Sequence, residues 1–398
     1  MNALKSVSSP KMLTAVWHEQ KRKLKGSCFG VDRLSSRAFE SELFQRIKEI
    51  EKRLSGSFEP MGLLAIPKEK PTGGHRVICV PTFSDRLIQF SVLRVLKPRL
   101  QRMGLDNSVS FGLAPGLDRS VLGARKQACK FREARPWVYK ADIQKFFDTI
   151  DRTTLIKAVE QVVPHKSLIP LLTAIVGTEI SDGFESGWKE IVSQAGITKG
   201  VGIRQGMPLS PLLAGAYLRG VDRQIIKSRA LVVRYVDDIA AFFQSEAECR
   251  KFHTVLRDAL ARIGLSIGEI DEPESKTRIY RPDQPADFLG MEIVTSPNGK
   301  CRLLLSEKAM TKIETKIAEL AVAERLFRKK VTLTTMGSYF QSVRMGYINA
   351  YDAAENRDEL SERLETYISG AQETVLIALF GDRLDQLSTG DRKFIGID

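Results

Sequence analysis

The 398-residue chain is poor in the side chains that build nitrogen- and sulfur-ligated metal sites. Its four histidines and five cysteines are scattered, with no Cys-x-x-Cys pair and no zinc-like spacing. An odd, dispersed set of cysteines is typical of reduced thiols in a cytoplasmic protein. We therefore expect a cytoplasmic location, and we expect any bound metal ion to be held mainly by carboxylates.

Long apolar runs are missing as well. No stretch approaches the roughly 20 apolar residues that span a bilayer, and the N-terminal segment lacks the apolar core of a signal peptide.

Acidic residues are outnumbered, 48 against 61 basic ones, which gives a net charge of +13. This excess indicates a polyanionic partner, either nucleic acid or an anionic membrane surface, although a basic protein kept soluble by its charge has the same composition.

Apolar spacing and turn residues predict most of the secondary structure. A hairpin is expected over 62–81, a strand over 136–143, and a loop or short hairpin over 181–203. Helices are expected over five segments: 10–55, 84–103 (capped by Ser84), 151–176, 208–228 and 245–264. This order predicts an α+β fold, with a βαββαβ core and helices on one face of the sheet. Charged helices follow beyond about residue 305.

Two adjacent aspartates stand inside the apolar run LVVRYVDDIAAFF (231–243). We expect Asp237 and Asp238 to form the turn between two strands, where their charge escapes the core. Two-residue turns favour Asn-Gly or Asp-Gly, however, and adjacent like charges raise a pKa or require a cation. Asp142 ends another apolar strand, in KADIQKFFDTID, so three carboxylates can converge. Paired Mg²⁺ ions prefer such ligands and can activate a 3′-hydroxyl and stabilise leaving pyrophosphate.

Seven motifs, in order, resemble those of bacterial group II intron-like reverse transcriptases. AIPKEKPTGGHRVICVPTFSDRLIQFSVLRVLKP and SFGLAPGLDRS are similar to fingers motifs, although the family has "YGFRPGRS" where the second has Leu-Ala. ADIQKFFDTID is similar to palm motif A, GIRQGMPLSPLLAGAYL to motif B, and RYVDDIAAFF to motif C, the YxDD box. GLSIGEIDEPESKT resembles motif D, and ADFLGMEI resembles the primer grip. In motif B, Arg204 stands where the family has proline.

The resemblance implies a right-hand polymerase fold. An N-terminal helical region (1–60) would precede the fingers and palm (61–305), and a helical thumb and C-terminal extension (306–398) would follow. It also implies RNA-directed DNA synthesis from dNTPs with two Mg²⁺ ions.

The motif positions imply the metal ligands. Asp142 and Asp237 would bind the ions, with Asp238 as the third carboxylate and the carbonyl of Ile143 facing a metal. Lys276 would donate a proton to pyrophosphate. The alternative for Lys276 is a lysine at a helix end or in a loop.

The same motifs imply the residues that contact the nucleotide. Phe147 would be an aromatic gate against a 2′-hydroxyl, although either Phe146 or Phe147 is expected to be a core aromatic. Gln205 and Gly206 would lie against the incoming nucleotide, because glycine allows close backbone approach. Lys68 and Arg76 would hold the triphosphate, and Tyr235 would support the primer end or the nucleotide. Solvated surface charge is the alternative for the two cations, and a strand aromatic for the tyrosine.

Several features bear on the kind of reverse transcriptase. We find no nuclease cluster, none of the "NAxxH" and "VTG" motifs of retron enzymes, and Ser210-Pro211 where diversity-generating enzymes have "SQ". A free-standing enzyme remains. Its C-terminal helices resemble those of bacterial defence-associated reverse transcriptases, and this resemblance implies a role in antiviral defence with a dedicated non-coding RNA. The expected partners are RNA template, DNA product and dNTPs, with no membrane. A homo-oligomer or a protein partner is left open.

Two other hypotheses stay open. One is a non-catalytic, maturase-like RNA-binding protein, and the other is a protein-primed or untemplated DNA polymerase on the same fold. The polymerase prediction fails if Asp142 lies far from the Asp237–Asp238 tip, or if a lysine consumes those oxygens and leaves no room for an ion.

Overall fold

The computed structural model describes residues 2–25, 29–70, 74–113, 116–181, 186–381 and 388. The chain forms two compact units. The first comprises Met1–Gln127 and Trp137–Ile279, and the second comprises Ala128–Pro136 and Tyr280–Asp398. No helix in the described part of the chain is long and apolar enough to cross a bilayer. The division into fingers, palm and thumb stays a prediction.

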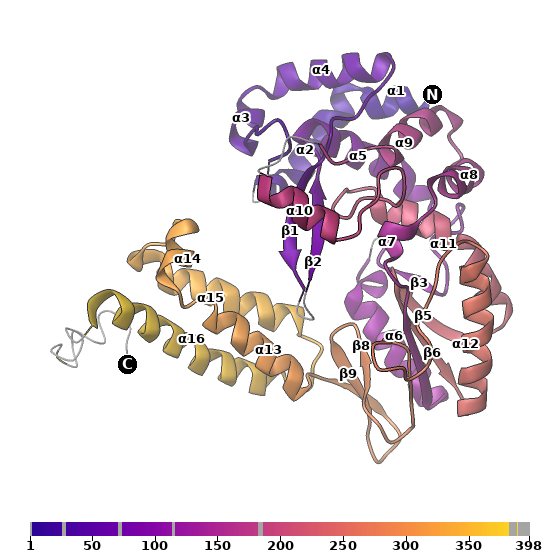
Figure 1. Cartoon of the computed structure of the whole chain (residues 1–398), viewed down its shortest axis with the longest axis vertical. Helices are drawn as coiled ribbons and strands as arrows, with labels where there is room; N and C mark the ends of the chain where they lie inside the picture. Colours follow the sequence, from indigo (N-terminus) through magenta and orange to yellow (C-terminus); the bar gives the residue numbers. More distant parts are fainter. Residues whose placement is uncertain are drawn as a thin grey trace. The chain divides into compact units, whose positions relative to one another are not determined.

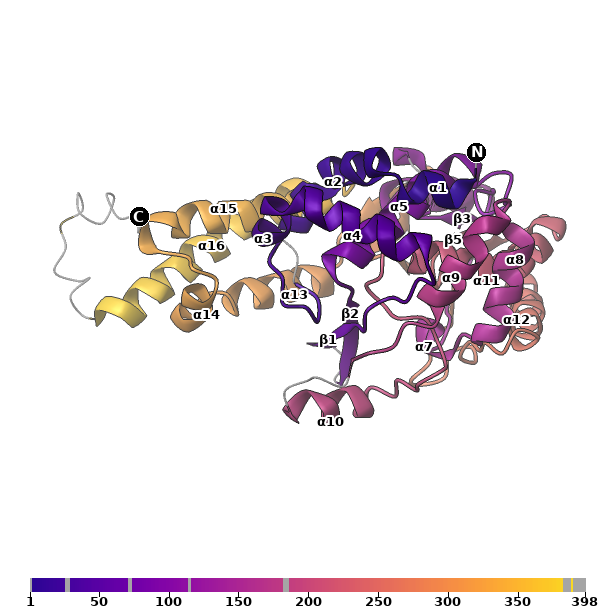
Figure 2. The same ribbon diagram turned by 90° about the horizontal axis from the view of Figure 1, so that it is seen from above.

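Four helices open the first unit: α1 (Ala3–Ser8), α2 (Pro10–Lys25), α3 (Ser36–Ser41) and α4 (Leu43–Ser55). Helices α1, α2 and α4 pack against α5 (Phe83–Leu96), as Figure 2 shows. Trp17, Phe39 and Phe83 meet at the centre with ring centroids 4.8–6.4 Å apart. The side chain of Thr82 caps α5 by accepting the N–H of Asp85, so the expected Ser84 cap was wrong by two residues.

The hairpin expected over 62–81 is confirmed. It consists of β1 (Leu64–Glu69) and β2 (His75–Val80), which pair antiparallel with Lys68 opposite Arg76. Three residues of the turn, 71–73, lie outside the described part of the chain. The two cations therefore stand on one face of a two-stranded ribbon, because directly opposite residues share a face.

A five-stranded sheet forms the centre of the first unit. Its strands are β3 (Ser110–Phe111), β4 (Trp137–Asp142), β5 (Leu231–Tyr235), β6 (Asp238–Phe243) and β7 (Arg278–Tyr280). Their order is β3-β5-β6-β4-β7, and β6 runs antiparallel to both β4 and β5. Helix α12 (Glu246–Ala261) packs on β4 and β6 (Figure 1). From β4 to β7 the chain follows the predicted βαββαβ order.

Between β4 and β5, the described part of the chain forms α7 (Phe146–Thr149), α8 (Arg152–Val162), α9 (Ile169–Val176), α10 (Ser186–Gln194) and α11 (Ser210–Lys227). The single helix expected over 151–176 was wrong, because Pro164 forces Val163 into an extended conformation and ends α8. The loop expected over 181–203 was also wrong where α10 forms. Helix α6 (Val121–Ala134) precedes β4.

The second unit contains a small antiparallel sheet in the order β10-β9-β8. Its strands are β8 (Ala286–Phe288), β9 (Met291–Thr295) and β10 (Cys301–Leu304). Four helices follow, as the charged pattern predicted: α13 (Glu307–Ala318), α14 (Ala323–Arg328), α15 (Leu333–Ala350) and α16 (Arg357–Phe380). Arg132, which is 1% exposed, donates hydrogen bonds to the carbonyls of Ile293, Arg281 and Pro282 and so ties the end of α6 to this sheet.

Candidate active site

Three aspartates meet where β4 ends and β6 begins. The β4–β6 register places Asp142 directly opposite Asp238, so both side chains leave the sheet on the same face. The carbonyl of Asp237 accepts the N–H of Ile143 at 3.3 Å, which joins the turn before β6 to the end of β4. The structure therefore brings together the three carboxylates that the sequence singled out. Their roles stay predictions.

The turn between β5 and β6 is made by Val236 and Asp237. Tyr235 pairs with Asp238, so Asp238 already belongs to β6 and the expected Asp-Asp turn was wrong by one residue. Val236 has φ +59°. A β-branched residue in this region is an outlier that costs about 1–3 kcal/mol. Backbone strain therefore lies immediately before Asp237.

Burial and like charge act on the two turn aspartates. Burial, followed by the charge of Asp142, raises the pKa of Asp237 to about 6. Burial also raises the pKa of Asp238, although Lys140 opposes the shift. A protein that ionises all three groups at neutral pH needs nearby positive charge.

Lys276 supplies one positive charge. Its ammonium group, on a side chain that is 72% exposed, pairs with Oδ2 of Asp142. Burial opposes the charged form of Lys276, but the hydrogen bond that it donates to Asp142 and the charges of all three carboxylates outweigh burial and raise the lysine pKa. The pair engages one carboxylate oxygen and does not consume the others.

The donor set fits a hard divalent cation. In the part of the chain that the structure describes, no group of three or more His, Cys, Asp or Glu side chains forms a ready-made metal cage. Mg²⁺ usually takes only one or two carboxylates and completes its shell with water and substrate phosphates. The raised pKa of Asp237 arises in part from charge repulsion that a cation would relieve. Residues and chemistry agree with the predicted Mg²⁺ ligands, but Mg²⁺ binding stays a proposal.

The Arg204–Gly206 segment packs against the hairpin. The carbonyl of Gln205 accepts the N–H of Cys79 on β2 at 2.6 Å. Gly206 has φ +104°, and a Cβ atom there would lie 2.7 Å from the Cys79 carbonyl oxygen. Glycine thus allows a close approach to β2, whereas the sequence reasoning placed that approach at the nucleotide.

Arg204 is part of an ion-pair network that the sequence did not reveal. Its side chain is 2% exposed, and Nη2 donates to Oε2 of Glu179 at 2.6 Å. Nη1 of Arg152 donates to Oε1 of the same carboxylate at 2.6 Å, and the N–H of Gly200 also donates to it. Glu179 therefore fixes the loop that carries Gln205. No local pattern around Glu179 could have indicated this.

Phe146 and Phe147 begin α7 and do not lie on a strand. Phe146 is 2% exposed and belongs to the core, as expected for one of the two, while Phe147 is half-buried beside it at a centroid distance of 5.3 Å. The Phe147 carbonyl accepts the N–H of Ile203 at 2.8 Å. Burial raises the pKa of Asp148, opposed by the charges of Arg204 and of Lys70 at the end of the hairpin. Helix α7 therefore lies within electrostatic reach of the hairpin.

The remaining predicted residues occupy different surroundings. Lys68 and Arg76 are exposed, as solvated charges or phosphate ligands would be. Tyr235 is half-buried, and burial raises its pKa. Gly112, with φ +87°, lies so close to this ring that a Cβ atom would be 2.8 Å from it. The link SFGLAPGLDRS thus supports Tyr235, although its residues 114–115 lie outside the described part of the chain.

Comparison with known proteins decides the family. A profile of the reverse transcriptase (RNA-dependent DNA polymerase) family matches residues 66–293. The chain belongs to this family. The chain is 29% identical to the group II intron-encoded protein LtrA of Lactococcus lactis subsp. cremoris over 186 residues. The matched segment covers 46% of this chain and 28% of LtrA. The predicted similarity to group II intron-encoded proteins is confirmed, while the defence-associated kind stays a prediction.

Two further relatives match with lower identity over longer stretches. Protein YkfC of Escherichia coli K12 is 23% identical over 205 residues, covering 49% of each chain. The putative COX1/OXI3 intron 2 protein of Saccharomyces cerevisiae is 24% identical over 225 residues, covering 56% of this chain and 24% of that protein. The chain thus spans half or less of the curated relatives described here.

One buried charge in motif C escaped the sequence reasoning. Arg234, one residue before Tyr235, is 2% exposed and pairs with Asp222 of α11, which is also 2% exposed. The argument that singled out Asp237, a charge inside an apolar run, applies equally to Arg234 in LVVRYV. A buried guanidinium needs an acidic partner, so the position of Arg234 in an apolar run could have indicated a buried ion pair.

Proposed function

We propose that the protein is an RNA-directed DNA polymerase that joins dNTPs with the help of two Mg²⁺ ions. The observation that carries this proposal is the meeting of Asp142, Asp237 and Asp238 at one end of β4 and β6. A reverse transcriptase that had lost its chemistry would have no need to keep three acids in a half-buried, mutually repelling group.

The chain's own residues divide the work of phosphoryl transfer. Asp142 and Asp237 would hold the ions, with Asp238 and the carbonyl of Ile143 beside them. When bound, such a pair of ions lowers the pKa of the primer 3′-hydroxyl and stabilises the leaving pyrophosphate. Lys276, already charged beside Asp142, is the proposed proton donor to that pyrophosphate.

Nucleotide binding would draw on the hairpin and the loops near it. Lys68 and Arg76 share one face of the β1–β2 ribbon and would hold the triphosphate. Phe147 would exclude a 2′-hydroxyl, and Gln205 with Gly206 would lie beneath the nucleotide. Tyr235 would support the primer end or the nucleotide.

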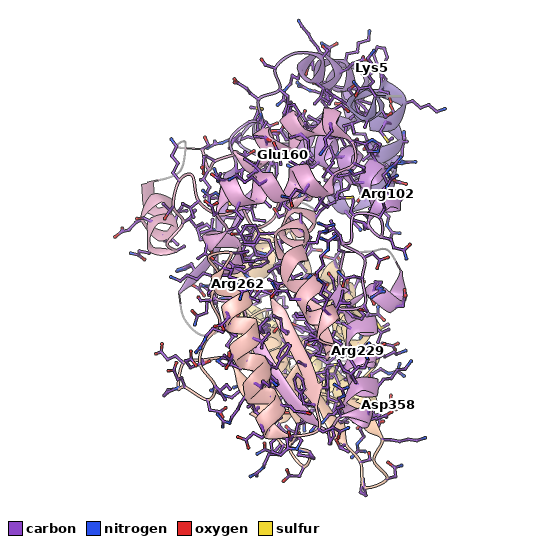
Figure 3. All side chains as sticks on the ribbon, turned by 90° about the vertical axis from the view of Figure 1, so that its right-hand side faces the viewer. Lys5, Arg102, Glu160, Arg229, Arg262 and Asp358 are labelled. Atoms are coloured by element: carbon purple, nitrogen blue, oxygen red, sulfur yellow. The ribbon has the colours of Figure 1, made fainter. Side chains whose placement is uncertain are left out.

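Charge favours a nucleic-acid template. Basic residues outnumber acidic ones by 13, and cations such as Lys5, Arg102 and Arg262 are exposed on the surface shown in Figure 3. Contacts between such cations and phosphates are independent of base sequence and weaken with salt. We propose an RNA template, DNA as product, and a dedicated non-coding RNA with a role in bacterial antiviral defence. The defence role rests on family resemblance alone.

Primer extension on a primed RNA with purified protein, Mg²⁺ and dNTPs tests the activity. Wild-type protein should make DNA, and the variant with Asp237→Ala and Asp238→Ala should make none. Asp258→Ala removes an acid that is 59% exposed on α12 and is the matched control, which should retain activity. Equal product from wild type and double variant would reject the polymerase proposal and favour a maturase-like RNA-binding protein. Sequencing the product distinguishes a copied RNA from untemplated or protein-primed synthesis.

A further inference from the structure

Arg234 connects the interior of the first unit to the turn that carries the aspartates. Its Nη1 donates a hydrogen bond to the carbonyl of Val236 at 2.9 Å. Its Nε donates to Oδ1 of Asp222 at 2.7 Å, and its Nη2 donates to Oδ2 of the same carboxylate. Nη2 also donates to Oγ of Ser110 at 3.0 Å. The rigid guanidinium fork is thus fixed on three sides.

The partners of Arg234 are themselves held in place. Asp222 is 2% exposed and receives a further contact from the side-chain amide of Asn107 at 3.4 Å. Oδ1 of Asn107 accepts the N–H groups of Val109 and Ser110, both at 2.9 Å. These bonds join α11, β3 and β5 around one cation, so the position of the fork does not depend on the turn that it contacts.

The turn is the part of this arrangement that needs holding. Val236 has φ +59°, a conformation that a β-branched residue adopts only when its surroundings impose it. The hydrogen bond from Arg234 fixes the carbonyl of Val236 and therefore the plane of the Val236–Asp237 peptide. The side chain of Asp237 projects from the residue at the far end of that peptide.

We propose that Arg234, held by Asp222, is a positioning residue that locks the Val236–Asp237 peptide and so directs the carboxylates of Asp237 and Asp238 toward Asp142. A buried ion pair can often be replaced by apolar residues without loss of stability, so stability alone does not require this pair. An apolar pair, however, cannot donate a hydrogen bond to the carbonyl of Val236. The consequence for catalysis rests on the proposed function, whereas the consequence for the turn does not.

Two variants separate positioning from folding. The double variant Arg234→Met with Asp222→Leu replaces the pair by apolar side chains and leaves no buried charge unpaired. Arg234→Lys keeps the charge but lacks the planar fork. Arg250→Lys, at an exposed i,i+4 pair on α12, is the control for an arginine-to-lysine change. We expect kcat to fall about 100-fold in the double variant, with KM for dNTP changed less than about threefold, because displaced catalytic groups mainly slow the chemical step.

Two readouts do not require DNA synthesis. Amide hydrogen exchange over residues 235–239 should be at least about tenfold faster in the double variant, because the strained turn opens more often. Mn²⁺ affinity, measured by electron paramagnetic resonance, should fall about 10–100-fold, as it does when residues that orient metal ligands are lost. Adding Val236→Gly should recover part of kcat and of Mn²⁺ affinity, because glycine adopts positive φ without strain.

The outcomes are distinct. A double variant that melts at the wild-type temperature and loses kcat, Mn²⁺ affinity and turn protection supports the proposal. One that keeps all three at wild-type values overturns it. If the double variant does not fold, Arg234→Lys decides by the same three measurements against Arg250→Lys. If wild-type protein makes no DNA, the proposed function fails, and exchange and Mn²⁺ affinity still decide whether Arg234 positions the turn.

Discussion

Asp142 and Asp238 lie directly opposite each other on β4 and β6, and Asp237 joins them from the turn. A sheet end is one of few places where three carboxylates can meet while their backbone groups stay paired. The cost is visible in the raised pKa of Asp237, which burial and Asp142 cause together. This site should therefore reduce stability when no cation is present.

Asp237→Asn should stabilise the protein in EDTA while abolishing DNA synthesis. The folded-state pKa of Asp237 is about 6 and its ordinary value is 3.8, so ionisation costs stability as pH rises from about 4 through 6. At pH 7.5 the unfolding free energy of the variant should exceed that of wild type by up to about 3 kcal/mol, and at pH 4 the two values should converge. Urea denaturation at both pH values measures this. Asp258→Asn should change the free energy by less than about 0.5 kcal/mol. Destabilisation by Asp237→Asn at pH 7.5 would contradict the prediction.

Phe147→Val should weaken discrimination against ribonucleotides. If the half-buried ring blocks a 2′-hydroxyl, removing it should raise the ratio of rNTP to dNTP incorporation about 10–100-fold, because pocket shape alone discriminates by this order. Single-nucleotide extension with each substrate measures the ratio. Phe146→Leu, in the adjacent core aromatic, should cost about 1–2 kcal/mol of stability and leave the ratio unchanged. An unchanged ratio in Phe147→Val would reject the gate.

The sequence predicts the strands and their acidic ends well, because both follow from local patterns. Asp142 ends one apolar run and Asp238 stands inside another, and βαββαβ order places those runs side by side. The turn between β5 and β6 was misplaced by one residue because local rules disfavour positive φ at valine. Such rules do not include the long-range hydrogen bond from Arg234 to the Val236 carbonyl, which stabilises the positive φ of Val236.

Long-range ion pairs explain most of what the sequence could not reveal. Glu179 meets Arg204 across 25 residues and Arg152 across 27. Nothing in the spacing of these residues distinguishes them from surface charge, and only their burial in the fold does. Helix α10 was missed because of its local sequence. The polar and glycine-rich residues around it are typical of a loop.

Glu179→Gln should destabilise the protein by about 3 kcal/mol at pH 7, because it removes the carboxylate that pairs with the buried guanidinium of Arg204. Burial opposes ionisation of Glu179, but hydrogen bonds from Arg204, Gly200 and Arg152 outweigh it and lower its pKa. This stabilisation is therefore present at neutral pH and is lost as pH falls below the ordinary carboxyl range. Urea denaturation at pH 7 measures the change in unfolding free energy.

Glu365→Gln is the matched control for Glu179→Gln. Glu365 is 73% exposed and pairs with Arg344, so its loss should cost less than about 1 kcal/mol. Equal costs for the two variants would show that the Glu179 network contributes no more than a surface ion pair.

Gly206→Ala should raise KM for dNTP, because the new methyl group cannot fit between the loop and β2. A Cβ atom at this position lies 2.7 Å from the Cys79 carbonyl oxygen, and φ is +104°. The loop must move away from the hairpin, which displaces Gln205 and breaks its 2.6 Å bond with the Cys79 N–H. Gly299→Ala, in the turn between β9 and β10, has the same backbone penalty, at φ +78°, with nothing within 4 Å of the added methyl group. Both variants should lose about 1 kcal/mol from the backbone conformation, but only Gly206→Ala should raise KM, by about tenfold or more. If the two variants show the same KM, contact between the loop and β2 does not shape the nucleotide site.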